Sequence, residues 1–254
     1  MKNIFRALVI GLTFSFMTLA VSAATFTVNT TNDTVDATPG DGICADAASA
    51  CSLRAAISEA NALAGDDTIT LPAGDYTQTL VAANEDLNAG GDFDITGNVT
   101  INGAGAGTTN IQANAAAGAA TERVLNVRAG ATVVLNGVTI RNGRFTGTMT
   151  AATRGAGIEN LGSLTLNNSI VSGNQLNSTS GNPIGAGIHN AGTVLTLTGT
   201  TVTGNVNTRV TGGSAFGGGV SSIVATAITI NNSSVSGNSA ISLAGGFGFG
   251  AGIY

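Results

Sequence analysis

The sequence predicts an all-β fold, a parallel β-helix of stacked coils, and three recurring patterns predict it. A glycine-rich phrase, Gly-Ala-Gly-Ile at 155–158, returns with small changes at 185–188, 217–220 and 250–253, at spacings of 30, 32 and 33 residues. An apolar-Thr-apolar run follows it at 164–166, 195–197 and 228–230, and a Val-Ser/Thr-Gly-Asn run at 171–174, 202–205 and 235–238. Repeats of this length are typical of solenoids, and three short runs closed by Gly or Asn predict three strands and three bends per coil.

Strand alternation predicts which side chains face the core. In the first complete repeat Ile158, Leu164, Leu166 and Val171 point inward. The same positions of later coils hold similar residues, so we expect Ile158, Ile188 and Val220 to stack in one column. Asn174, Asn205 and Asn238 are expected to form a ladder at one bend, where amides bridge adjacent coils.

The expected strands begin after residue 65 and give roughly six coils. They are 68–71, 93–95, 99–101, 124–127, 132–135 and 138–140, followed by the runs of the later repeats. Between those repeats, inserts at 175–183, 207–214 and 239–248 fall at the same point of successive coils and are expected to stack as loops on one side.

The N-terminus predicts export. Residues 1–23 combine Lys2 and Arg6, an apolar stretch and the small residues Val21-Ser22-Ala23, as in a cleaved signal peptide, and the apolar stretch is too short for a bilayer span. Cleavage would change the net charge from −5 to 7 − 14 = −7. That charge argues against nucleic acid or an anionic membrane as partner.

Residues 24–65 predict an N-terminal cap. Cys44 and Cys51 are the only cysteines, and in an exported chain they predict a disulfide. The segment 52–64 has the apolar spacing of an amphipathic helix, with Ser52 as its cap and Gly65 at its end. We expect this helix to cover the open first coil of the β-helix, which spans 66–254.

The segments Cys51-Ser52-Leu53-Arg54-Ala55-Ala56-Ile57 and Glu59-Ala60-Asn61 resemble the N-terminal module of bacterial CSLREA-domain proteins. One residue departs from the motif, since Ala55 stands where the family has Glu. The resemblance implies export and a right-handed parallel β-helix of the pectin-lyase-like kind. It transfers no catalytic residue, because the family carries no agreed activity.

Acidic residues provide the candidate sites. Polysaccharide lyases and glycoside hydrolases need clustered carboxylates, and here such chemistry would have to use Asp92, Asp94, Arg141 and Glu159. Calcium binding is a second hypothesis, and its candidates are Asp33, Asp36, Asp41, Glu85 and Asp86. No calcium-motif spacing is present, so solvated turn acids are the simpler interpretation and no cofactor is required.

Two further patterns have simple interpretations. Arg141 and Arg144 fall in an arginine-rich stretch that can contact an acidic glycan, although pairing with Glu122 and Glu159 in a solvated loop is simpler. His189, the sole histidine, is expected to be exposed and isolated.

Thr165, Thr196 and Thr229 form an outward column of the kind found in ice-binding β-helices. Those proteins pair each threonine with a second one on the same face. The neighbours here are inward Leu or Ile, so strand propensity is the simpler explanation.

Two function classes remain open. The first is a secreted or cell-surface, noncatalytic β-helix that acts in adhesion or display and contacts a glycan or a host surface through its stacked loops. The second is a lyase or hydrolase acting on an acidic glycan, which is suggested by fold alone. Because the sequence ends at Tyr254 directly after a new repeat, we expect a truncated β-helix, and the missing part could hold an anchor, a sorting signal or a catalytic coil.

Overall fold

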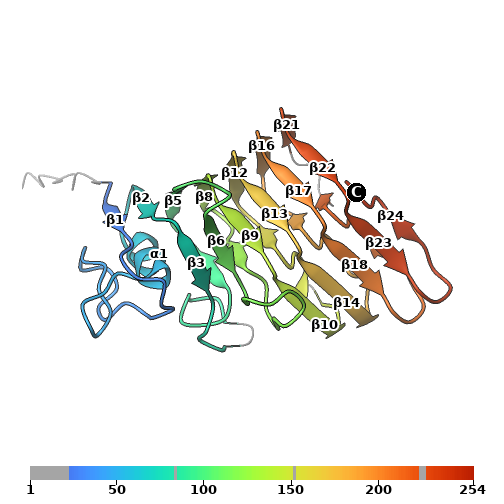
Figure 1. The fold of residues 1–254 in the computed structure, drawn as a ribbon, viewed down its shortest axis with the longest axis horizontal. Helices are drawn as coiled ribbons and strands as arrows, with labels where there is room; N and C mark the ends of the chain where they lie inside the picture. Colours follow the sequence, from blue (N-terminus) through green and yellow to red (C-terminus); the bar gives the residue numbers. More distant parts are fainter. Residues whose placement is uncertain (1–22, 83–84, 151–152, 223–226) are drawn as a thin grey trace, which may run out of the picture.

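The computed structural model describes residues 23–82, 85–150, 153–222 and 227–254. It is a right-handed parallel β-helix of about six turns (Figure 1), as the sequence predicts. Three sheets form the sides of the cylinder. Sheet A contains β1 (Thr25–Thr27), β2 (Asp66–Leu71), β5 (Asn98–Gly103), β8 (Thr132–Asn136), β12 (Ser163–Asn167), β16 (Val194–Thr198) and β21 (Ala227–Asn231).

The other two sides have the same construction. Sheet B contains β3 (Gly74–Thr77), β6 (Thr109–Gln112), β9 (Thr139–Arg141), β13 (Ile170–Ser172), β17 (Thr201–Thr203) and β22 (Ser234–Ser236). Sheet C contains β4 (Phe93–Ile95), β7 (Leu125–Val127), β11 (Ile158–Asn160), β15 (Ile188–Asn190) and β20 (Val220–Ser222).

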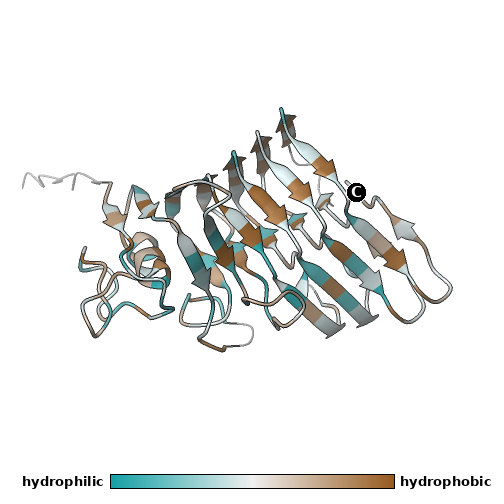
Figure 2. Ribbon diagram, viewed as in Figure 1, coloured by the Kyte–Doolittle hydropathy of each residue, from teal (hydrophilic) through white to brown (hydrophobic). Residues whose placement is uncertain are grey.

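The core confirms the predicted stacking. Ile158 pairs with Ile188 and Ile188 with Val220 in the parallel registers of β11, β15 and β20, and all three side chains are buried. The same holds in sheet A, where Leu164 lies beside Leu195 and Leu195 beside Ile228. Figure 2 shows the hydrophobic residues as bands that cross successive strands at the same level. Each coil therefore buries its apolar face against its neighbours.

The predicted asparagine ladder is present. Asn174 Nδ2 donates to Asn205 Oδ1, and Asn205 Nδ2 donates to Asn238 Oδ1, each at 2.9 Å. The amides also donate to carbonyls of the preceding coil, as Asn205 Nδ2 does to Val171 O at 3.0 Å. The ladder thus satisfies backbone groups at the bend after sheet B.

The repeated glycines are required by space and by backbone conformation. Gly185 has a φ of +66°, in the left-handed region, and a Cβ there would lie 2.9 Å from His189 Cβ. At Gly187 a Cβ would meet Gly219 O at 2.4 Å and Asn205 Nδ2 at 2.9 Å. Gly185 therefore makes a tight turn over His189, and Gly187 allows the next coil to approach closely.

The inserts expected to be loops contain strands, so the later coils have at least four strands each rather than three. A fourth parallel sheet, here called the wing, contains β10 (Arg144–Thr148), β14 (Gln175–Ser180), β18 (Val206–Arg209) and β23 (Ser239–Ser242). Two short return strands, β19 (Ala215–Phe216) and β24 (Gly248–Phe249), pair beside it. The inserts do stack on one side, but as a sheet that encloses a small second core of Phe145, Met149, Ala156, Leu176 and Ala186.

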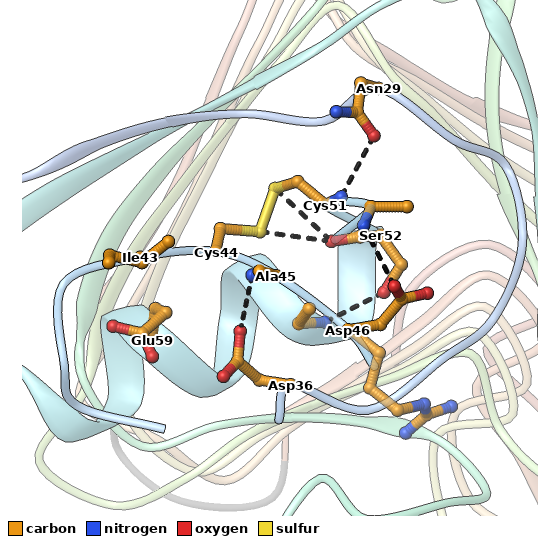
Figure 3. The surroundings of a disulfide bond; sticks show 12 residues. Asn29, Asp36, Ile43, Cys44, Ala45, Asp46, Cys51, Ser52 and Glu59 are labelled. Atoms are coloured by element: carbon orange, nitrogen blue, oxygen red, sulfur yellow. Dashed lines mark hydrogen bonds between the residues drawn. A yellow bond between two sulfur atoms is a disulfide. The ribbon is translucent and has the colours of Figure 1, made fainter. Parts of the chain in front are cut away.

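The cap is built around α1 (Leu53–Ala62), which Figure 1 places at the N-terminal end beside the first coils. Ser52 is its N-cap, because Ala55 N donates to Ser52 Oγ at 3.0 Å, and Leu63 ends the helix just before Gly65. The predicted disulfide joins Cys44 to Cys51 directly before the helix (Figure 3).

The polar residues that carry the family resemblance fasten this cap. Buried Arg54 pairs with Asp33 at 2.6 Å, donates to Gly91 O at 2.8 Å and stacks on the Phe93 ring. Glu59 accepts hydrogen bonds from the backbone of the acidic turn at Gly40 and Gly42.

Among the described residues, no helix has the length and apolarity to cross a bilayer. Nearly all of the predicted signal peptide lies outside the described residues.

Candidate functional site

A row of polar side chains runs along the outward side of sheet C, one residue per coil. Its members occupy the middle position of successive strands and are paired in register: Asp94, Asn126, Glu159, His189 and Ser221. All five are buried although they point away from the cylinder. The Gly-x-Gly turns cover part of the row, since Gly155, Gly185 and Gly217 pack on its last three members or their backbone. This polar row is the base of the candidate site.

A pocket of about 280 Å³ opens beside the row. Its lining gathers charged side chains in a chain that is only 9% charged. The pocket is lined by Glu85, Asp86, Asp92, Glu122, Arg123, Asn126, Arg128, Arg154, Glu159, Leu161 and Ala191.

Arg123 joins the acids of the pocket. Its Nε lies 2.8 Å from Asp92 Oδ2 and its Nη1 lies 3.3 Å from Glu159 Oε2. All three side chains are more than nine-tenths buried, and Arg123 also packs over the Phe145 ring at 5.4 Å from its centroid. The wing thus supplies one wall of this charged group.

Burial changes the proton affinities of the site. It raises the pKa of Glu159 to about 7, although Arg123 and Arg154 oppose the shift. Burial likewise raises the pKa of Glu122 to about 7 and that of Asp94 to about 8, with Asp92 adding a like charge in both cases. Carboxyls with such pKa values can donate or accept a proton near neutral pH.

His189 differs from its sequence-based interpretation, because it is fully buried and has an acid beside it. Its Nε2 lies 3.9 Å from Glu159 Oε1, and burial together with nearby Arg154 and Arg123 lowers its pKa to about 4. Within the described part of the chain neither ring nitrogen has a hydrogen-bond partner. The sequence missed this because the glycine turn that covers His189 is visible only in three dimensions.

The four residues of the catalytic hypothesis separate into two places. Asp92 and Glu159 line the pocket, and Asp94 lies in the polar row two strands away from Glu159. Arg141 lies on sheet B, where Nε donates to Gln112 at 2.7 Å and Nη2 pairs with Asp75. Arg123 therefore takes the position beside Glu159 that the sequence had suggested for Arg141 and Arg144.

The calcium candidates are not brought together. Asp33 binds Arg54, and Asp36 accepts hydrogen bonds from Thr38 and Ala45. Asp41 accepts one from Ile43 N. Glu85 binds backbone amides of its own loop, whereas Asp86 pairs with Arg128 at 2.7 Å. Among the described residues no group of three potential metal ligands converges.

The sequence assigned no role to Asn126, whereas Glu122 was named as a partner of the arginines and Arg154 belongs to the arginine-rich stretch. Asn126 had a readable signal, because the strand triplets Phe-Asp-Ile, Leu-Asn-Val, Ile-Glu-Asn and Ile-His-Asn align with a polar residue in the middle. Glu122 and Arg154 lie outside the strands of the repeat, so their position at the pocket could not be read from it.

Comparisons with known proteins add no relative from which a role could be transferred. No protein-family model, no curated protein and no solved structure gives a significant match to this chain.

Proposed function

We propose that this chain is an exported, CSLREA-type β-helix that binds a glycan in the pocket beside sheet C. The observation that carries the proposal is the pocket itself, where five carboxyl side chains and three arginines line one cavity of a charge-poor protein. Burying charge costs free energy and is not needed to stack coils, so this concentration points to a ligand.

The charge balance favours a neutral, polyhydroxylated ligand over a polyanion. Three arginines and five acids sum to −2, and protonation of Glu122 and Glu159 brings the sum to zero. Carboxylates, amides and guanidinium groups can all hydrogen-bond to sugar hydroxyls. The disulfide in the cap agrees with an oxidising, extracellular location.

Glycan retention on an array of neutral and acidic polysaccharides tests this proposal. Arg154 is half-buried and lines the pocket, whereas Arg141 is a surface arginine on sheet B and serves as the control. We expect Arg154→Ala to weaken binding about tenfold or more through loss of a charged hydrogen-bond donor. Arg141→Ala should leave binding unchanged. Equal affinities of both variants and the parent would contradict the pocket as binding site.

A second candidate is glycan cleavage, favoured by the two pocket glutamates whose pKa values lie near 7. Lyase turnover releases an unsaturated product that absorbs ultraviolet light, and hydrolysis releases new reducing ends. If cleavage occurs, Glu159→Gln should abolish it while Arg141→Ala does not. Retention without either product supports the noncatalytic function.

A further inference from the structure

The outward side of sheet A carries two parallel columns of small uncharged residues, which are polar except for Val134. The first column is paired in register through seven strands: Thr25, Thr68, Thr100, Val134, Thr165, Thr196 and Thr229. The second lies two residues further along each strand: Thr27, Thr70, Asn102, Asn136, Asn167, Thr198 and Asn231. We call these two columns the Thr/Asn face.

This pairing corrects the sequence-based interpretation of the threonine column. The residues next to Thr165, Thr196 and Thr229 are indeed inward Leu or Ile, but in a strand the neighbour on the same face is two positions away. Those positions hold Asn167, Thr198 and Asn231. Six of the seven strands therefore present a Thr-x-Thr or Thr-x-Asn pair outward.

The Thr/Asn face is open and uncharged. Every side chain in it is exposed or half-buried, and none is charged or aromatic. None of its threonine hydroxyls hydrogen-bonds to another group of the described protein, so they are available to a ligand. Asn136 donates to Asn102 at 2.7 Å and Asn167 donates to Asn136 at 2.9 Å, which holds the second column in line.

Strand propensity does not account for both columns. It favours threonine but disfavours asparagine, which recurs at four of the seven companion positions. The outward side of sheet B is less regular. Its last two strands present Thr201-x-Thr203 and Ser234-x-Ser236 pairs, but its earlier strands carry the Asp75–Arg141 ion pair. A neutral array that continues through all seven strands of sheet A is instead what a regular neutral ligand would require.

The spacings of the array resemble those of solid water. Adjacent strands lie about 4.8 Å apart, and two residues along one strand span about 6.7 Å. Tetrahedral water with oxygens about 2.75 Å apart repeats every ~4.5 Å between second neighbours and every ~7.3 Å along the perpendicular axis. With the middle strand of the seven in register, the mismatch between strands grows to only about 0.9 Å at each outer strand.

We propose that the Thr/Asn face binds ice. Threonine hydroxyls and asparagine amides hydrogen-bond to lattice water, and the threonine methyl groups order the water between them. The columns are fixed by backbone pairing before contact, so little conformational entropy is lost on binding. This site is separate from the glycan pocket, which lies beside sheet C.

Partition of the purified chain between slowly growing ice and the remaining liquid tests the proposal, together with the hysteresis between freezing and melting temperatures. The test variant is Thr196→Lys, in the middle of the first column. Its matched control is Thr203→Lys on β17, an equally half-buried outward position of sheet B. Circular dichroism and thermal unfolding establish that both variants are folded.

We expect the parent and Thr203→Lys to be enriched in ice several-fold over a serum albumin reference and Thr196→Lys to lose most of that enrichment. Exclusion of the parent from ice to the same extent as albumin would overturn the proposal, as would equal behaviour of the two lysine variants. Retention of the parent, but not of Thr196→Lys, on crystalline cellulose or chitin without enrichment in ice would identify another lattice as the ligand. That result would also overturn the proposal. Arg154→Ala should leave ice enrichment intact, which separates this result from failure of the glycan proposal.

Discussion

At the scale of single residues, the third position of the repeated phrase has no space for a side chain. Gly187 does not have a left-handed φ, so its identity is set by contact rather than by backbone conformation. A methyl group there would press on Gly219 O and on the amide of Asn205. The glycine and the asparagine ladder are therefore complementary parts of one packing arrangement.

Gly187→Ala should reduce the free energy of unfolding by about 1–3 kcal/mol, because an overpacked interior must move backbone atoms to accept the methyl group. Denaturant unfolding measures the change. Gly107→Ala is the control, since nothing lies within 4 Å of the added Cβ. A substitution at 187 that is as harmless as the one at 107 would contradict the proposed close approach.

The contacts between core residues could be predicted because successive coils are related by translation. Once the repeat is recognised, Ile188 has to lie beside Ile158, and Asn205 beside Asn174. Burial of outward residues such as His189 could not be predicted, because it depends on the path of a turn that covers them. The candidate site belongs to this second class, which is why only part of it was expected.

At the scale of elements, sheet C combines a regular ladder with buried ionisable groups. Asp94, Glu122 and Glu159 bind protons more tightly in the folded state than their ordinary pKa values of 3.8, 4.5 and 4.5 would allow. Their contribution to stability is complete below about pH 4 and is lost as pH rises through 7 to 8. His189 acts oppositely, since its contribution is lost as pH falls from 6.5 toward 4.

Above pH 6.5 only the carboxyl effect remains, so the melting temperature should fall between pH 6.5 and 8.5. Glu159→Gln removes one of the titrating groups and should make this fall shallower. Asp41→Asn, in the exposed turn of the cap, is the control and should leave the slope unchanged. Thermal unfolding at several pH values is the measurement, and a melting temperature that rises over this window would refute the assignment.

The wing shows which elements the sequence could not reveal. Its strands, such as Gln-Leu-Asn-Ser-Thr-Ser in β14 and Val-Asn-Thr-Arg in β18, carry few large apolar residues. They form because the backbone of each wing strand pairs with the equivalent strand of the adjacent coil, as β14 pairs with β18. The alternation of apolar residues therefore identifies the strands around the main core, whereas the wing strands are stabilised by pairing between adjacent coils.

At the scale of the whole molecule, hydrogen bonds connect the cap to the backbone of the candidate site. Arg54 bonds to the carbonyls of Gly91 and Asp92, and Asn61 Nδ2 donates to Asp94 O. The helix thus holds the backbone that carries two acids of the site. A cap predicted only to cover the first coil also positions the strand that begins the polar row.

Arg54→Met should destabilise the protein by about 3–5 kcal/mol, because it leaves the Asp33 carboxylate buried without its partner. Adding Asp33→Asn should recover part of that loss. Arg128→Met breaks the exposed pair with Asp86 and should cost less than about 1 kcal/mol. Calorimetric unfolding compares these three variants with the parent, and equal losses at Arg54 and Arg128 would be inconsistent with a buried pair that holds the cap.

A glycine turn covers the middle residue of three strands of sheet C, β11, β15 and β20. Three residues that differ in charge and size occupy this equivalent, buried position in successive coils: Glu159, His189 and Ser221. The backbone pairing is the same at all three positions. A single substitution per coil can therefore change the chemistry of this row, while the backbone pairing keeps neighbouring side chains at a constant separation.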